Sequence, residues 1–129
     1  MRQSAGIIRV CFVSPKAYPL FDPSVQGVIG GAEVDLYMLA AELAKDDLFD
    51  VSMITADYGQ PPEQIIENVR VIKSLDFKQN PLTGAIKIWK AFKKANADIY
   101  MLKTPSPGVP LTAMFCRLHK RAFLYRLAS

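Results

Sequence analysis

Short apolar runs alternate along the chain with longer segments in which apolar residues recur at helical spacing. Five of the short runs are rich in β-branched or aromatic residues and are bounded by turn residues, as buried strands are. They span residues 7–13, 50–55, 69–75, 97–104 and 121–127. The pattern therefore predicts five strands.

Three segments between these runs have the spacing of helices. They span residues 32–45, 81–95 and 107–120. The first is apolar on nearly all sides, with Asp35, Glu42 and Asp46 as its one polar stripe, so we expect it to be largely buried.

Two connections have no clear periodicity. Residues 16–29 are interrupted by Pro19, Pro23 and Gly27 and predict a long irregular loop. Residues 58–68 are barely enough for a crossover helix, so they predict a single turn or an irregular loop.

Strands that alternate with helices predict an α/β fold, a Rossmann-like three-layer sandwich with a mainly parallel sheet. The expected strand order, numbered along the chain, is 3-2-1-4-5. A chain of 129 residues, half of them hydrophobic, suits one domain, residues 1–129. The fifth strand falls at the end of the chain with no helix to cover it. We therefore expect the chain to be truncated from a longer protein.

Charge and cysteine content narrow the function classes. Lys and Arg outnumber Asp and Glu by 16 to 12, an excess that suits anionic ligands or surfaces but is too small to predict a nucleic-acid partner. Cys11 and Cys116 lie inside apolar runs and predict buried, reduced thiols rather than a disulfide. No segment resembles a signal peptide or a membrane span, so a cytoplasmic location is expected.

The pair Gly30-Gly31 stands in the first strand–helix connection, directly before a predicted helix. In an α/β sheet this is the usual phosphate site, because glycines allow close approach to the N–H groups of the first helical turn. The Gly-x-Gly-x-x-Gly fingerprint and the Walker pattern are both absent. By pattern alone, a plain turn and a phosphate site both remain open.

Four segments, "IRVCFVSPKAYP", "GGAEVDLYMLAAELAK", "DVSMIT" and "ADIYMLKTP", together resemble the amino-terminal half of a GT-B fold glycosyltransferase of family 4. The resemblance implies an acceptor-side domain that faces a second, donor-binding domain across a cleft. The full enzyme would transfer a sugar, with retention, from a nucleotide-sugar to a glycan or lipid acceptor. It implies no cofactor or metal in this half, because the nucleotide-sugar is a co-substrate.

Carried over residue by residue, the resemblance places Gly30 and Gly31 against the donor diphosphate. Lys16, Tyr18 and Lys103 are candidate acceptor contacts. Glu33 has a plainer interpretation, since a carboxylate in the first helical turn complements the helix dipole.

The residues that this family uses for catalysis are missing from the chain. Its donor-binding Glu-x7-Glu pair belongs to the second domain, and His119 does not match the family's histidine position. We interpret His119 as a surface residue or a partner of the helix dipole. No metal-ligand spacing or nucleophile–base pairing is apparent. The chain alone is therefore expected to be inactive, with no catalytic residue.

The segment "IKIWKAFKKA" combines lysines with aromatic residues. Lys87, Lys90 and Lys94 fall on one helical face and Trp89 on another. This predicts either an ordinary amphipathic helix with a solvated lysine face, or an interfacial helix drawn to anionic lipids at the inner face of a membrane. Two further functions stay open for the whole chain: a free-standing nucleotide- or phosphate-binding module, and a membrane-docking domain.

Overall fold

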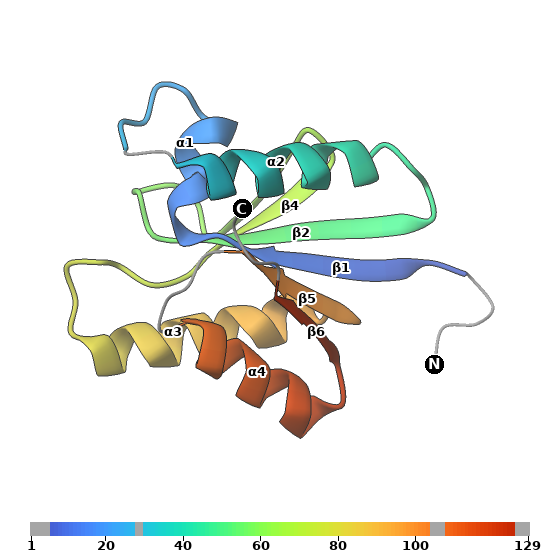
Figure 1. Ribbon diagram of the computed structural model, residues 1–129. Helices are drawn as coiled ribbons and strands as arrows, with labels where there is room; N and C mark the ends of the chain where they lie inside the picture. The colour runs from blue at the N-terminus through green and yellow to red at the C-terminus, as the bar shows by residue number, and fades with distance from the viewer. Residues whose placement is uncertain (1–5, 28–29, 104–107, 126–129) are drawn as a thin grey trace.

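The computed structural model describes residues 6–27, 30–103 and 108–125. Helices cover both faces of a sheet in three layers (Figure 1). The strands are β1 (Ile8–Val13), β2 (Phe49–Thr55), β3 (Glu63–Ile66), β4 (Val69–Lys73), β5 (Ile99–Leu102) and β6 (Ala122–Tyr125). The helices are the 3-10 turn η1 (Pro15–Ala17), α1 (Tyr18–Phe21), α2 (Gly31–Leu43), α3 (Pro81–Ala95) and α4 (Gly108–His119).

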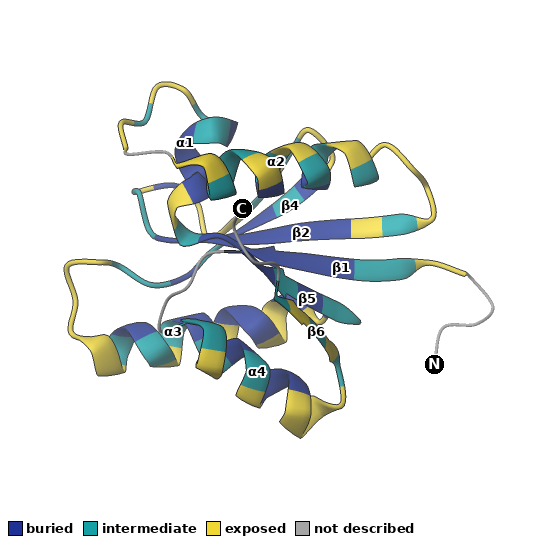
Figure 2. Cartoon of the chain, viewed as in Figure 1, coloured by how far each residue is buried: buried dark blue, intermediate teal, exposed yellow. Residues whose placement is uncertain are grey.

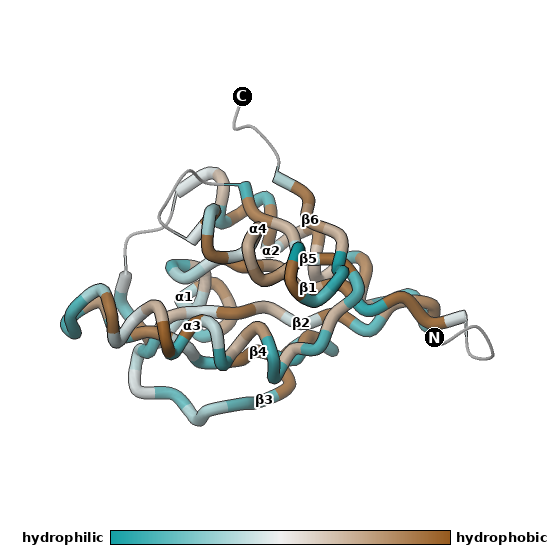
Figure 3. The backbone as a smooth tube through the Cα atoms, turned by 90° about the horizontal axis from the view of Figure 1, so that it is seen from below, coloured by the Kyte–Doolittle hydropathy of each residue, from teal (hydrophilic) through white to brown (hydrophobic). Residues whose placement is uncertain are grey.

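The sheet has six strands in the order β3-β4-β2-β1-β5-β6. Figure 3 shows this sequence of strands from one edge to the other. All neighbours pair in parallel except β3 and β4. The predicted α/β fold and mainly parallel sheet are confirmed, and the five predicted strands lie in the predicted order. The predicted ends at Thr104, Pro107, Arg126 and Leu127 fall outside the described residues.

The sixth strand, β3, lies where the sequence predicts only a turn or a loop. It pairs antiparallel with β4 across Glu67 and Asn68. Both residues have positive φ, 53° and 65°, the conformation of the tight two-residue hairpin turn. Asn tolerates this conformation, but Glu is an uncommon residue there, so the sequence carries no strong hairpin signal.

Each face of the sheet has its own core. Side chains of β1, β2 and β4 pack on one face against η1, α1 and α2. The other core lies under α3 and α4 and contains Phe92, Tyr100 and Phe115, whose ring centroids are 5.2–5.9 Å apart. In Figure 2 the buried residues accordingly lie on the inward faces of the helices and along the central strands.

Helix α2 is less buried than its composition predicts. Only Leu36 and Ala40 are fully buried, and Met38 is 62% exposed. The helix covers the sheet with a single face, and Phe21 of α1 packs edge-to-face on its Tyr37, with 4.9 Å between ring centroids. The helix therefore has more apolar residues than its packing buries.

The predicted irregular loop over residues 16–29 contains two helical turns. Pro15 begins η1, and Pro19 occupies the first turn of α1, where a missing N–H costs no hydrogen bond. The prolines thus start helical turns here instead of breaking them. Val28 and Ile29 lie outside the described residues.

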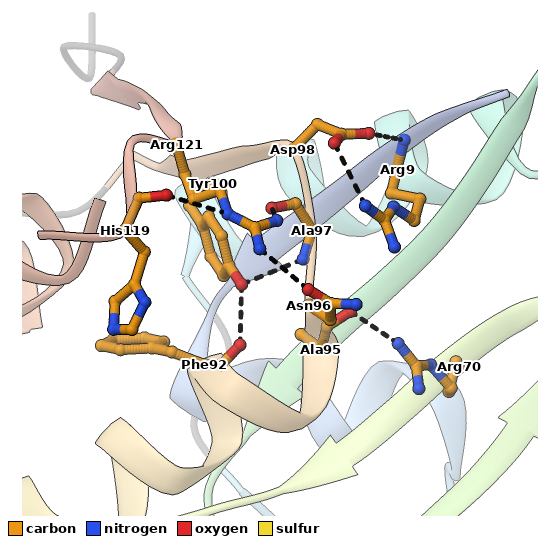
Figure 4. A network of polar contacts seen from close by, with 10 residues as sticks. All are labelled: Arg9, Arg70, Phe92, Ala95, Asn96, Ala97, Asp98, Tyr100, His119 and Arg121. Atoms are coloured by element: carbon orange, nitrogen blue, oxygen red, sulfur yellow. Dashed lines mark hydrogen bonds and ion pairs between the residues drawn. The ribbon is translucent and has the colours of Figure 1, made fainter. Parts of the chain in front are cut away.

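At the amino edge of the sheet, where the parallel strands begin, arginines hold the turn that follows α3 (Figure 4). Asn96 ends the helix in the left-handed conformation, with φ of 46°. Arg70 donates to the Ala95 carbonyl at 2.8 Å, and Arg121 donates to the Ala97 carbonyl at 2.6 Å and to Asn96 Oδ1 at 3.0 Å. The bond from Arg70 satisfies a carbonyl group that the end of α3 leaves unpaired, and the bonds from Arg121 fix the turn that follows.

Tyr100 extends this network into the core. Its buried hydroxyl donates to the Phe92 carbonyl at 2.7 Å and accepts from the Ala97 N–H at 3.0 Å. Nearby, the carboxylate of Asp98 accepts from the backbone N–H of Arg9 at 2.9 Å and from its guanidinium at 3.4 Å. The amino edge is therefore cross-linked by side chains.

Candidate functional site

The carboxyl ends of the five parallel strands define the opposite edge of the sheet, and α2, α3 and α4 start from it (Figure 1). In open α/β sheets, ligands bind outside this edge. The residues predicted to bind the diphosphate and the acceptor lie at this edge on the α2 side. The α3 and α4 side of the same edge holds a cavity that the sequence did not reveal.

Gly30 and Gly31 form the start of α2, but they differ in their surroundings. Gly30 is the N-cap, and a Cβ at this position would lie 2.6 Å from Glu33 Oε1. Gly31 is the first helical residue and is exposed; among the described residues, no atom lies within 4 Å of where its Cβ would be. A Cβ at position 30 would require the flexible Glu33 side chain to shift, whereas a Cβ at position 31 would contact no other described side chain.

Glu33 closes the start of the helix. Its Oε1 accepts a hydrogen bond from the Gly30 N–H at 2.8 Å, the half of a capping box that a glycine N-cap permits. Its negative charge lies in the first turn, at the positive end of the helix dipole. The predicted structural role of Glu33 is confirmed.

Lys103 lies just past the end of β5 and is only 8% exposed. Its ammonium group forms an ion pair with the carboxylate of Asp35 on α2, whose side chain is 54% exposed. The pair ties the end of β5 to the second turn of α2. A buried ammonium group needs such a partner, so Lys103 serves the structure, and the acceptor contact proposed for it remains a prediction.

The two candidate acceptor residues of the first connection have different surroundings. Lys16 is exposed in η1. Tyr18 is 3% exposed, stacks on Tyr58 with 5.8 Å between ring centroids, and accepts a hydrogen bond from Gln64 Nε2 at 2.7 Å. Of these two residues, Lys16 presents its side chain to solvent, whereas Tyr18 belongs to the core.

A cavity of about 330 Å³ lies between the first turns of α3 and α4. Its floor is formed by Val13, Ile88 and Leu102, each at most 3% exposed, and its walls include Leu75 and Leu111. These residues come from β1, β5, α3, α4 and the connection after β4. No short motif unites them, so only the fold brings them together.

The residues predicted as a membrane surface on α3 divide between core and solvent. Lys90 and Lys94 are exposed and Lys87 is half-buried. Trp89 packs edge-to-face on Phe115 of α4, with 5.2 Å between ring centroids, and its partners there also include His119 at 6.5 Å. Trp89 therefore joins the two helices, which favours the ordinary amphipathic helix for this residue.

His119 is exposed, and its ring stacks on Phe115 with 4.3 Å between centroids. It lies in the last turn of α4, where a positive charge would face the negative end of the helix dipole. The interpretation of His119 as a surface residue is confirmed.

The two cysteines are free and buried, as predicted. Burial raises the pKa of Cys11 to about 12 and that of Cys116 to about 11. Both thiols therefore stay protonated at neutral pH, which removes the thiolate that a nucleophile or a metal ligand requires.

Over the described parts of the chain, no group of three or more His, Cys, Asp or Glu side chains is placed to hold a metal ion. None of the helices described is long and apolar enough to cross a membrane. No protein-family model matches the chain, and no curated protein matches it significantly.

Proposed function

We propose that the chain is the acceptor-side domain of a retaining glycosyltransferase that transfers a sugar from a nucleotide-sugar to a glycan or lipid acceptor. The supporting observation is Gly31, an exposed glycine at the start of α2 and on the carboxyl edge of the sheet, where a Cβ would contact no other described side chain. The catalytic carboxylates and most donor contacts belong to a second domain across the cleft.

In this proposal the donor diphosphate approaches the first turn of α2. The N–H groups of that turn carry partial positive charge and point at the ligand, and the missing Cβ at Gly31 lets phosphate oxygens reach them. Glu33 already occupies the Gly30 N–H, so the diphosphate would bind the N–H groups that follow. Lys16, exposed just past β1, faces the acceptor from the same edge.

Replacing Gly31 tests the phosphate role. In the enzyme that joins this chain to its donor domain, we expect Gly31→Val to lower transfer by roughly 100-fold or more, because a branched side chain displaces the diphosphate. The measurement is nucleotide diphosphate release from a panel of UDP-, GDP- and ADP-sugars. Met38→Val, on the exposed face of α2, is the control and should keep full activity.

The melting temperature of Gly31→Val should stay near that of the unchanged enzyme, since position 31 is exposed and a Cβ there contacts no other described side chain. Near-normal transfer by a folded Gly31→Val enzyme would reject the phosphate role and leave Gly30-Gly31 as a plain turn. The proposal also requires the gene to continue beyond Ser129 into a second Rossmann-like domain with Glu-x7-Glu. A stop codon there would favour the free-standing nucleotide- or phosphate-binding module.

A second function, contact with an anionic membrane surface, is favoured by the outer side of α3 and α4. These helices contain no Asp or Glu, and α3 exposes Lys90, Lys93 and Lys94. Large apolar side chains are exposed on the same helices: Leu82 72%, Ile86 50%, Met114 55% and Leu118 65%. Exposed apolar groups beside lysines suit the interface of a bilayer with anionic headgroups. Trp89 is packed between the helices, so in this proposal Leu82 and Ile86, rather than Trp89, are the apolar residues of α3 that contact the membrane.

Vesicle co-sedimentation tests this surface. We expect the chain to bind vesicles that contain phosphatidylglycerol but not pure phosphatidylcholine, and to lose binding in Lys90→Glu/Lys93→Glu and in Leu82→Ser/Ile86→Ser. The matched controls are Lys45→Glu, just after α2, and Met38→Ser on that helix, which lie across the sheet and should leave binding unchanged. Equal loss in the controls, or no binding at all, would reject the membrane contact.

A further inference from the structure

The cavity between α3 and α4 has an apolar interior and a polar mouth. Val13, Ile88 and Leu102 are buried at its floor, while Asp76, Gln79 and Asn80 lie among the residues around it. Its volume of about 330 Å³ is at the lower end of the range of small-molecule sites, about 300–1,000 Å³. This distribution of polarity fits a ligand with an apolar part and a polar part.

Gly84 lines the cavity from the first half of α3. Its backbone does not have a positive φ, and a Cβ there would meet only Leu75 Cβ, at an ordinary 3.6 Å. Neither backbone conformation nor packing therefore requires glycine, although a glycine inside a helix costs about 1 kcal/mol relative to alanine. What the glycine does is keep this wall of the cavity free of a side chain.

The cavity adjoins the glycine and lysine side of the carboxyl edge. Val13 and Leu102 of its floor are the last residues of β1 and β5. Pro15 lines the cavity and is followed by the exposed Lys16 in η1. An apolar chain bound in the cavity would therefore have its polar end at the carboxyl edge of the sheet, where Lys16 also lies. Phe77, 55% exposed, adds an apolar surface at the mouth.

We propose that this cavity holds the apolar chain of the acceptor, and that the acceptor is a lipid-linked molecule rather than a plain glycan. The assignment rests on the proposed glycosyltransferase function, because that function supplies an acceptor at this edge. The alkyl or isoprenyl chain occupies the space beside Gly84, and the head that receives the sugar lies toward Lys16 and Gly31.

Methyl NMR can test the cavity without a sugar donor and without the transfer reaction. The probe is dodecyl β-D-maltoside below its critical micelle concentration, and maltose is the control ligand. We expect saturable shifts of the Ile88, Leu102 and Leu111 methyl groups with dodecyl maltoside and none with maltose. Absence of these shifts would overturn the proposal.

Two substitutions at one position separate the cavity from the rest of the surface. Gly84→Leu should fill the cavity and weaken binding of dodecyl maltoside by tenfold or more, whereas Gly84→Ala should keep it within about threefold. If Gly84→Leu fails to fold, Ala85→Leu at the same wall replaces it. Binding that is unchanged in the filled variant would locate the alkyl chain elsewhere and overturn the assignment.

Failure of the lipid assignment and failure of the proposed function give different results. Gly31→Val tests the proposed function alone and should lower transfer by roughly 100-fold or more, whereas binding of dodecyl maltoside tests the cavity and requires no transfer. If the joined enzyme transfers sugar to a free glycan as well as to its lipid-linked form, and Gly84→Leu has no effect, the lipid assignment is wrong and the transferase stands. If no sugar is transferred to any acceptor, the proposed function is wrong whatever the cavity binds.

Discussion

The two edges of the sheet differ in how side chains surround the backbone. At the amino edge, Arg70 and Arg121 bond the carbonyl groups around the end of α3, and Tyr100 fixes the same turn from inside. At the carboxyl edge, a Cβ on Gly31 would contact no other described side chain, and Gly84 lines a cavity beside α3. At the amino edge, side chains bond the chain's own backbone groups, whereas at the carboxyl edge two glycines leave positions without a side chain.

We interpret this difference between the two edges as a division of roles: side chains at the amino edge stabilise the fold, and the carboxyl edge binds ligands. The amino edge also has a cavity, about 390 Å³ and lined by Arg9 and Arg70, but these side chains already bond Asp98, Glu63 and the Ala95 carbonyl. Their charges are already engaged within the fold. We therefore expect substitutions at the amino edge to lower stability, and glycine substitutions at the carboxyl edge to alter ligand binding with little loss of stability.

The largest effect on stability is expected for Arg121→Ala. This change removes hydrogen bonds to the Ala97 carbonyl and to Asn96 Oδ1 and should lower the free energy of unfolding by about 2 kcal/mol. Urea denaturation measures the change. Arg117→Ala on the exposed side of α4 is the control and should stay within about 0.5 kcal/mol. Equal effects of the two variants would contradict a structural role for the amino edge.

Tyr100→Phe should cost about 1 kcal/mol at neutral pH. The hydroxyl donates to the Phe92 carbonyl and accepts from the Ala97 N–H, and its loss leaves that buried N–H without this partner. Urea denaturation again measures the change, and Tyr125→Phe in β6, which is less buried, provides the comparison. A larger loss of unfolding free energy in Tyr125→Phe would contradict a stabilising role for the Tyr100 hydroxyl in this turn.

The cost of Tyr100→Phe should depend on pH. Burial raises the pKa of Tyr100 from 10 to about 12 in the folded protein, so the unfolded chain loses the phenolic proton first as pH rises. The stability that the neutral phenol contributes is therefore complete below pH 10 and is lost between about pH 10 and 12. The difference in unfolding free energy between the unchanged protein and Tyr100→Phe should shrink over this range. A difference that grows would mean that the sign of the pKa shift is wrong.

The smallest effects are expected for alanine at the two glycines. Gly84→Ala should raise the free energy of unfolding by about 0.5–1 kcal/mol, because alanine favours the helix and its Cβ meets Leu75 at an ordinary distance. Gly31→Ala should change it by less than about 0.5 kcal/mol. Thermal denaturation followed by circular dichroism measures both. A loss above about 1 kcal/mol in either variant would mean that the fold itself needs the glycine.

Periodicity in the sequence is enough to predict most of the fold. Each parallel strand is a compact apolar run, and Asn80-Pro81 marks the start of α3. The strand β3 escapes prediction because its hairpin uses Glu67-Asn68 instead of a glycine turn. Pro19, Pro23 and Gly27 predict an irregular loop, although Pro15 and Pro19 lie in the first turns of η1 and α1, where Tyr18 is buried.

The candidate site is predictable only in its local part. Gly30, Gly31 and Glu33 are close in the sequence, so the pattern that they form at a helix start can be recognised from the order of residues alone. The cavity is different, because its floor joins Val13, Ile88 and Leu102, which are far apart along the chain. Proximity of that kind depends on the order of the strands and not on any local motif.

The central position of β1 has a consequence for how the chain acquires its structure. The strand pairs with β2 on one side and with β5 on the other, and its contact Arg9–Asp98 joins residues 89 positions apart. Closing so long a segment is entropically costly, and folds dominated by distant contacts fold slowly. During synthesis, β1 leaves the ribosome before β5, so one of its edges stays uncovered until β5 appears. A chaperone that shields apolar strand edges should therefore act on the nascent chain before residue 99 appears.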